Sequence, residues 1–212
     1  MFTAGGVAGL MLALGAGGAI IAAVAVRGRW RRFAPLVAAG ALVFQVVHVI
    51  EHGLQVAVWA GEPGARPWIS PWAAETATGV GHWCSILAPA SSPNPLGTEL
   101  LHLYGNVIFL AGLVVLVGLP HLADHRLARI AMLIQVVHVA EHVVLSGTLV
   151  ATGTAHGLST HLDQVLPIGA STTRVLFHFG INAVATAYAV LAVRRAGWRP
   201  WSSALRPALA TT

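Results

Sequence analysis

Six histidines and two glutamates fall in a pattern that the sequence contains twice. Residues 45–52 read QVVHVIEH and residues 135–142 read QVVHVAEH, so seven of eight positions are identical. A histidine followed four residues later by an asparagine also occurs twice, as His102 with Asn106 and as His178 with Asn182. Imidazole and carboxylate groups are metal ligands. The order H-x-x-E-H, then H-x-x-x-N, then the same again indicates a duplicated metal site.

Residues three or four positions apart lie on one face of a helix, so each copy of the pattern forms polar stripes on otherwise apolar helices. The candidate metal ligands are His48, Glu51, His52, His102, His138, Glu141, His142 and His178. Four amides share these stripes, namely Gln45, Asn106, Gln135 and Asn182. We expect the amides to fix imidazole tautomers or to serve as outer ligands.

This ligand set indicates two transition-metal ions, each with three histidines and one glutamate. Imidazole suits zinc, copper and iron, and a carboxylate adds a preference for iron or manganese over copper(I). Helical bundles bind metal pairs through carboxylates and histidines on facing helices. Iron or copper is therefore favoured, with zinc as a further option. The simpler hypothesis is a polar network without metal, which accounts poorly for six histidines repeated in register.

The composition requires that helices in a membrane position these residues. The chain has 212 residues, of which 56% are hydrophobic and only 9% charged, whereas soluble domains have about 25% charged residues. A span needs about 20 apolar residues. Five such stretches, at residues 4–26, 33–60, 100–119, 130–151 and 168–193, predict an all-α integral membrane protein with one transmembrane domain over residues 1–212.

The repeats cover about residues 41–118 and 131–193. Both begin on the same side, so spans two to five should form a four-helix bundle with a pseudo-twofold axis near the membrane normal. At 1.5 Å per residue, His52 and His142 lie roughly 12 Å from the outer ends of their spans. We therefore expect all six histidines in one layer of the outer half of the bilayer. The glycine-rich first span is peripheral and packs on its own bundle or on a second copy.

The charges predict the orientation of the chain. The formal net charge is +5, and all twelve basic residues are arginines. Ten of the twelve fall on one side of a five-span chain, which the positive-inside rule assigns to the cytoplasm. The N-terminus and the loops at 61–99 and 152–167 would then lie outside the cytoplasmic (inner) membrane, with the C-terminus inside. Arginines that anchor topology leave no reason to expect a nucleic-acid partner.

The function most favoured by these residues is a dinuclear metal oxidoreductase in the lipid bilayer. Its partners would be a lipid-soluble substrate or a separate electron-donor protein. Membrane desaturases and hydroxylases resemble this chain in placing histidine-rich helices near one membrane face, but their H-x-x-H-H boxes are absent here. The likeness is therefore one of arrangement only.

Three further functions remain open on sequence grounds. Bis-histidine haem ligation within a four-helix bundle would give a transmembrane electron-transfer protein. H-x-x-E-H is also the inverted zincin pattern, which would give an intramembrane zinc hydrolase. A buried cluster of histidine, glutamate and asparagine resembles the dinuclear centres of zinc and iron permeases, which would give a metal transporter or sensor. The apolar inner half of the bundle argues against a continuous transport path.

Overall fold

The computed structural model is built from helices throughout the part of the chain that it describes. That part comprises residues 32–61, 71, 73–77, 95–120, 122, 125–166 and 170–198. Its principal elements are α2 (Ala34–Gly61), α4 (Pro95–Val117), α5 (Arg126–Thr152), α6 (Leu158–Val165) and α7 (Ala170–Arg195). Among the described residues, four helices (α2, α4, α5 and α7) are long and apolar enough to cross a membrane. The expected first span, residues 4–26, lies outside the described residues.

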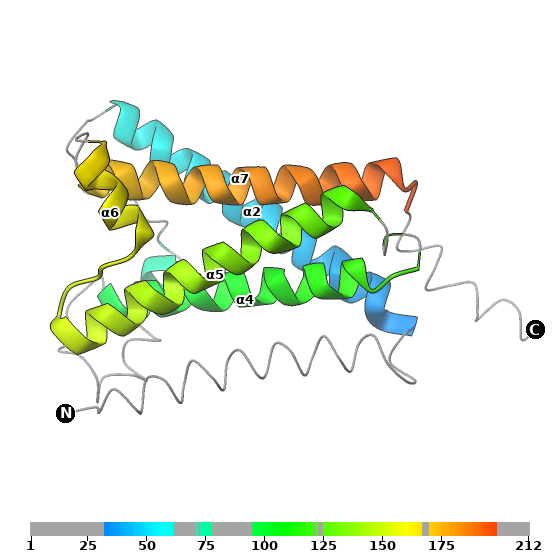
Figure 1. Ribbon diagram of the computed structural model, residues 1–212, viewed down its shortest axis with the longest axis horizontal. Coiled ribbons are helices and arrows are strands. Elements are labelled where there is room, and N and C mark those ends of the chain that lie inside the picture. The colour runs from blue at the N-terminus through cyan, green and yellow to red at the C-terminus, as the bar shows by residue number, and fades with distance from the viewer. Residues whose placement is uncertain are drawn as a thin grey trace, which may run out of the picture.

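The four long helices form a closed ring. α2 packs against α4 and α7, and α5 packs against the same two helices. Figure 1 shows that each helix runs antiparallel to the two that it contacts, so α2 and α5 end where α4 and α7 begin. We call this the α6 end, because α6 also lies there. Each long helix therefore presents one face to a common interior.

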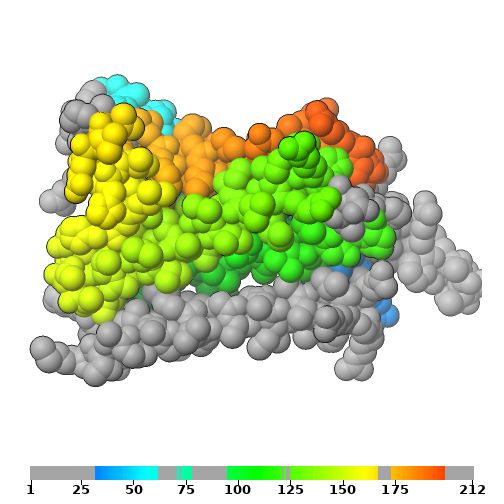
Figure 2. All heavy atoms as spheres, in the orientation of Figure 1, coloured from blue at the N-terminus to red at the C-terminus, as the bar shows by residue number. Residues whose placement is uncertain are grey.

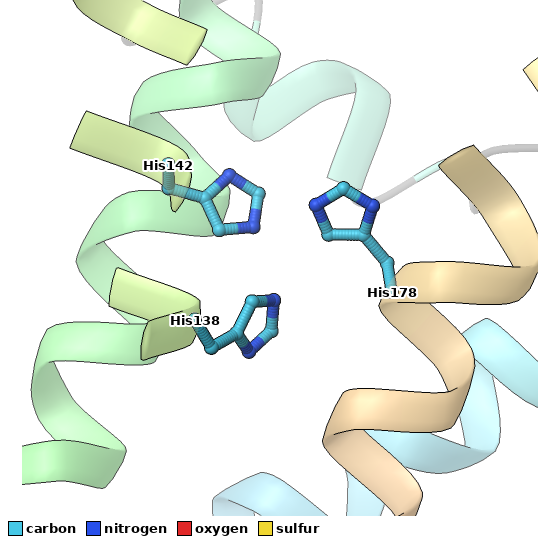
Figure 3. Close-up of side chains that lie close together, drawn as sticks. All are labelled: His138, His142 and His178. Atoms are coloured by element: carbon cyan, nitrogen blue, oxygen red, sulfur yellow. The ribbon is translucent and has the colours of Figure 1, made fainter. Parts of the chain in front are cut away.

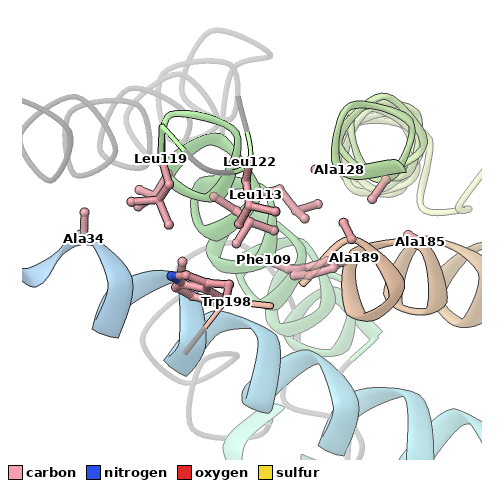
Figure 4. Packing of buried hydrophobic residues seen from close by; sticks show 14 residues of the cluster. Ala34, Phe109, Leu113, Leu119, Leu122, Ala128, Ala185, Ala189 and Trp198 are labelled. Atoms are coloured by element: carbon pink, nitrogen blue, oxygen red, sulfur yellow. The ribbon is translucent and has the colours of Figure 1, made fainter. Parts of the chain in front are cut away.

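The half of the bundle away from the α6 end is a close-packed apolar core. Its residues come from all four long helices and the turn after α4 (Figure 4). Small residues allow close approach: a Cβ placed on Gly112 of α4 would lie 2.2 Å from the Cβ of Ala41 on α2. The opposite surfaces of the helices expose large apolar side chains such as Val47, Ile50 and Leu133. A helix bundle surrounded by lipid has apolar side chains both in its interior and on its outer surface.

α6 is a short helix that the sequence did not predict. It lies within the loop expected at 152–167 and packs against α7. In Figure 2 its atoms (yellow) occupy the space beside the ends of α5 and α7. In the loop at 61–99, residues 73–77 are helical.

Candidate metal centre

All six predicted histidine ligands meet inside the bundle. Successive rings lie 4.5–5.7 Å apart between centroids and form one continuous cluster. Helical rise places this cluster about 10–20 Å from the α6 end. The expectation of a single histidine layer is confirmed by these ring contacts. Whether the rings bind metal stays a prediction.

The first triad consists of His48 and His52 on α2 and His102 on α4. Its three ring centroids are separated by 4.5, 5.7 and 5.5 Å. The Nε2 atoms of His48 and His52 lie 3.1 Å apart. Two nitrogens bound to one tetrahedral ion at 2.0–2.1 Å are separated by about 3.3 Å. The spacing of this pair is therefore already suitable for a shared ion.

The second triad consists of His138 and His142 on α5 and His178 on α7. Figure 3 shows the rings of the two helices facing one another across the interior. One ring nitrogen from each residue lies within 4.8 Å of the others. All three side chains are buried, with residue exposures of 0–5%. Small rotations of the rings would bring the nitrogens to the spacing of a tetrahedral site.

The two triads are in direct contact. The His102 and His142 rings are stacked, 5.5 Å apart between centroids and inclined by 12°. Two ions held by the triads would therefore be neighbours. Whether the two triads hold the metal pair expected from the duplicated motif stays a prediction.

Backbone oxygens fix the tautomers of two histidines in equivalent positions. His102 Nδ1 lies 2.8 Å from the Thr98 carbonyl oxygen, and His178 Nδ1 lies 2.8 Å from that of Arg174. A carbonyl oxygen only accepts, so each Nδ1 carries the proton and donates it. Each Nε2 then has a free lone pair, which is the form that binds metal. His178 Nε2 is buried without a hydrogen-bond partner among the described residues.

The four predicted amides form a belt that ties the helices together beside the histidine layer. Gln45 Nε2 donates to Asn182 Oδ1 at 2.6 Å, and Gln135 Nε2 donates to Asn106 Oδ1 at 2.8 Å. The asparagine Nδ2 atoms donate to the carbonyl oxygens of His102 and His178, both at 2.8 Å. These bonds run between amides and backbone, so the described contacts give the belt a structural role. The tautomers of His102 and His178 are set by backbone carbonyls instead.

Glu141 holds α6 rather than facing the rings. Its carboxylate accepts hydrogen bonds from Leu158 N at 2.6 Å, Ser159 N at 2.9 Å and Ser159 Oγ at 2.6 Å. A carboxylate is favoured at a helix N-terminus, where free N–H groups and the helix dipole attract negative charge. A Cβ on Gly157 would lie 2.7 Å from Glu141 Oε1, so only glycine admits this contact. The expected ligand is therefore engaged elsewhere. Glu51, the matching residue on α2, is half-buried and remains a predicted ligand.

Glu99 is a carboxylate that the structure brings to the ring of His142. Its Oε2 lies 3.5 Å from His142 Nδ1, and its Oε1 accepts a hydrogen bond from Arg174 Nη2. Glu99 is 4% exposed. In the sequence, Glu99 lies one helical turn before His102, which is the position of a possible partner. The matching position before His178 is occupied by Val175, so the repeat did not single out Glu99. Its role could not be expected from the repeat alone.

Gln55 is a second residue that sequence reasoning missed. Its Oε1 accepts a hydrogen bond from His52 Nδ1 at 2.8 Å. Its position three residues after His52 on the same stripe was the available signal. The repeat does not extend to this position, because Leu145 is the corresponding residue after His142. Gln55 was therefore not recognised as a partner of His52.

Fold and site together define a helical protein of membrane-spanning character with a cluster of six histidines in two triads, four of them buried. The chain belongs to a family of unknown function, DUF6008, whose model matches residues 1–203. No curated protein and no solved structure matches the chain. Its function must therefore be inferred from the chemistry of the site.

Proposed function

We propose that this chain is a membrane metalloprotein in which the two histidine triads each bind one transition-metal ion. The observation that carries the proposal is the second triad. Five ring nitrogens of His138, His142 and His178 are buried with no hydrogen-bond partner among the described residues. A buried polar group without a partner costs about 1–3 kcal/mol. An ion bound by one nitrogen of each ring would satisfy several of these groups together.

We further propose that the centre is an oxidoreductase centre using iron or copper, with zinc less favoured. Sets of imidazoles suit iron and copper, and stacking of His102 on His142 would place two such ions side by side. The interior is closed by an apolar core on one side, which would limit water at the ions. A lipid-soluble substrate or a separate electron-donor protein would complete the reaction. The chain's own residues would bind and orient the ions and exclude water.

The packing of the rings disfavours haem. A haem needs two axial histidines on opposite faces of a flat macrocycle, with space for the whole porphyrin between helices. Here six rings contact one another at 4.5–5.7 Å between centroids. Interiors are packed as densely as organic crystals, so a porphyrin would require the helices to separate. Bare ions need no such change.

A zinc hydrolase and a metal transporter are also less well supported. In an inverted zincin, the glutamate of H-x-x-E-H activates water, but both oxygens of Glu141 accept hydrogen bonds from α6. A transporter needs a polar route through the membrane. The half of the bundle beyond the amide belt is filled by apolar residues such as Phe109, Leu113 and Leu116. We therefore favour chemistry at one face over transport.

We propose that the chain has five spans, with α2–α4 and α5–α7 as parallel repeats in the cytoplasmic membrane. Supporting evidence comes from the matched hydrogen bonds of the amide belt. The exposed arginines Arg126, Arg129, Arg194 and Arg195 lie at the end opposite α6. That end would be cytoplasmic by the positive-inside rule. The α6 end, the histidines and the N-terminus would then lie toward the outside, and the glycine-rich first span could join two copies.

Metal analysis of the purified protein, together with its absorption spectrum, tests the proposal. We expect two iron or copper ions per chain, no Soret band, and a spectrum that changes on chemical reduction. His138→Ala should lower the metal content, whereas His156→Ala should not, because His156 is exposed in the loop before α6. Protein without metal in every preparation would overturn the proposal. Zinc alone would overturn the redox assignment, and a Soret band would overturn binding of bare ions.

A further inference from the structure

We propose that Glu99 orients and polarises His142, and thereby strengthens metal binding at the second triad and not at the first. The inference rests on the proposed function and names a positioning residue for one of its two sites. It begins from the 3.5 Å separation between Glu99 Oε2 and His142 Nδ1. That distance is longer than a hydrogen bond, and both atoms lack a hydrogen-bond partner among the described residues. A small shift of either side chain would join them.

Three neighbouring histidines show what the contact would do. In each of them Nδ1 faces an oxygen acceptor at 2.8 Å: His52 with Gln55, His102 with Thr98 and His178 with Arg174. Each acceptor holds the proton on Nδ1 and so leaves the lone pair on Nε2, the nitrogen that would bind an ion. Glu99 occupies this position for His142. With Glu99 as acceptor, His142 would offer Nε2 in the same way as His178, its partner in the second triad.

Arg174 pairs with the Glu99 carboxylate and fixes its orientation. Its guanidinium binds Glu99 Oε1 and leaves Oε2 toward His142. The Arg174 side chain is 33% exposed, while that of Glu99 is 6% exposed. The ion pair therefore extends from the edge of the bundle into its interior. Because the carbonyl oxygen of Arg174 also fixes His178, this one residue supports two ligands of the second triad.

The first triad has a neutral acceptor at the corresponding position. His52 corresponds to His142, and its Nδ1 donates to the amide oxygen of Gln55. A carboxylate raises the basicity of a histidine ligand when it accepts from the other ring nitrogen. Its negative charge also attracts a bound cation, more strongly in a buried site than in water. Glu99 should therefore strengthen the binding of a divalent ion at the second triad, with no such effect at the first.

Titration with Co²⁺ in detergent, followed by visible absorption, tests this difference. His48→Ala leaves only the second triad complete, and His138→Ala leaves only the first. We expect Glu99→Gln to weaken Co²⁺ binding about 10–100-fold in the His48→Ala background and to shift its absorption bands. In the His138→Ala background the same change should alter neither quantity. Glu99→Asp, which keeps the carboxylate, should bind more tightly than Glu99→Gln in the His48→Ala background.

Unchanged binding after Glu99→Gln in the His48→Ala background would overturn the inference. Equal weakening in both backgrounds would also overturn it, because that result indicates a general structural role. If Glu99→Gln fails to fold because Arg174 loses its partner, the double change Glu99→Gln with Arg174→Gln replaces both charges and permits the same measurement. Absence of Co²⁺ binding in the unaltered protein would instead count against the proposed function, and it is observed before Glu99 is changed.

Discussion

Gln45 and Asn182 join α2 to α7 through a 2.6 Å hydrogen bond in which both side chains are fully buried. The equivalent bond on the other side of the ring joins Gln135 of α5 to Asn106 of α4. α2 and α4 carry the first copy of the sequence pattern and α5 and α7 carry the second, so each bond links the two copies. The amide belt therefore connects the two halves, while each histidine triad lies within one half.

Asn182→Leu should lower the free energy of unfolding by about 1–3 kcal/mol, because it leaves the Gln45 amide buried without its acceptor. Changing Gln45 to Leu in the same protein should recover part of this loss, since both polar groups are then removed. Unfolding in mixed detergent micelles, followed by tryptophan fluorescence, gives the free energies. Coupling between the two positions is expected at about 0.6 kcal/mol, the average found for hydrogen bonds between membrane helices, and at most about 1.7 kcal/mol. Strictly additive effects would contradict the bond.

His48→Ala and His178→Ala should each remove about one of two bound ions, and the double variant should remove both. The reason is that each triad draws its ligands from its own helix pair, α2 with α4 or α5 with α7. Metal content per chain, measured after dialysis, checks this expectation. His161→Ala is the matched control, because His161 is exposed on α6. Loss of both ions from either single variant would show that the six histidines form one site.

Much of this site followed from the sequence because the membrane restricts what a buried histidine can do. Polar groups on apolar helices turn inward, so the spacing of His48, His52, His138 and His142 determined which faces meet. The four described spans were also predicted within about five residues of the observed helix ends. The difference is largest at α4, which begins at Pro95 instead of residue 100. The extra turn contains Glu99.

Contacts between unlike parts of the chain could not be predicted. Glu141 lies on the same stripe as His138 and His142, which made it a candidate ligand, but its partners belong to α6 in a polar loop. No periodic pattern marks an eight-residue helix of that kind. Similarly, the pair of Glu99 and Arg174 joins α4 to α7 without following from the repeat. The repeat predicts only those features that both halves share.

Glu141→Gln should release α6 while leaving the histidine cluster in place. The amide keeps one acceptor oxygen but loses the charge that the N-terminus of α6 favours, which is worth about 0.3–1 kcal/mol and up to about 2 when partly buried. Hydrogen exchange at Leu158 and Ser159 should become faster, whereas metal content should stay at the wild-type value. Gly157→Ala should have the same effect, because its Cβ would meet the Glu141 carboxylate at 2.7 Å. Loss of metal in the Glu141→Gln variant would contradict this expectation and would indicate that Glu141 is a metal ligand.

Gly112→Ala should force α2 and α4 apart in the apolar core. The new Cβ would lie 2.2 Å from the Cβ of Ala41, which is a backbone-fixed atom that no side-chain rotation can move. Overpacking of this kind costs about 1–3 kcal/mol. Ala41→Gly in the same chain removes the colliding atom and should restore most of the lost stability, as thermal unfolding in detergent would show. Gly147→Ala is the control, because a Cβ there meets nothing within 4 Å. If Gly112→Ala is as stable as this control, the two helices that carry the first triad are not in close contact at Gly112, and the spacing of that triad would differ as well.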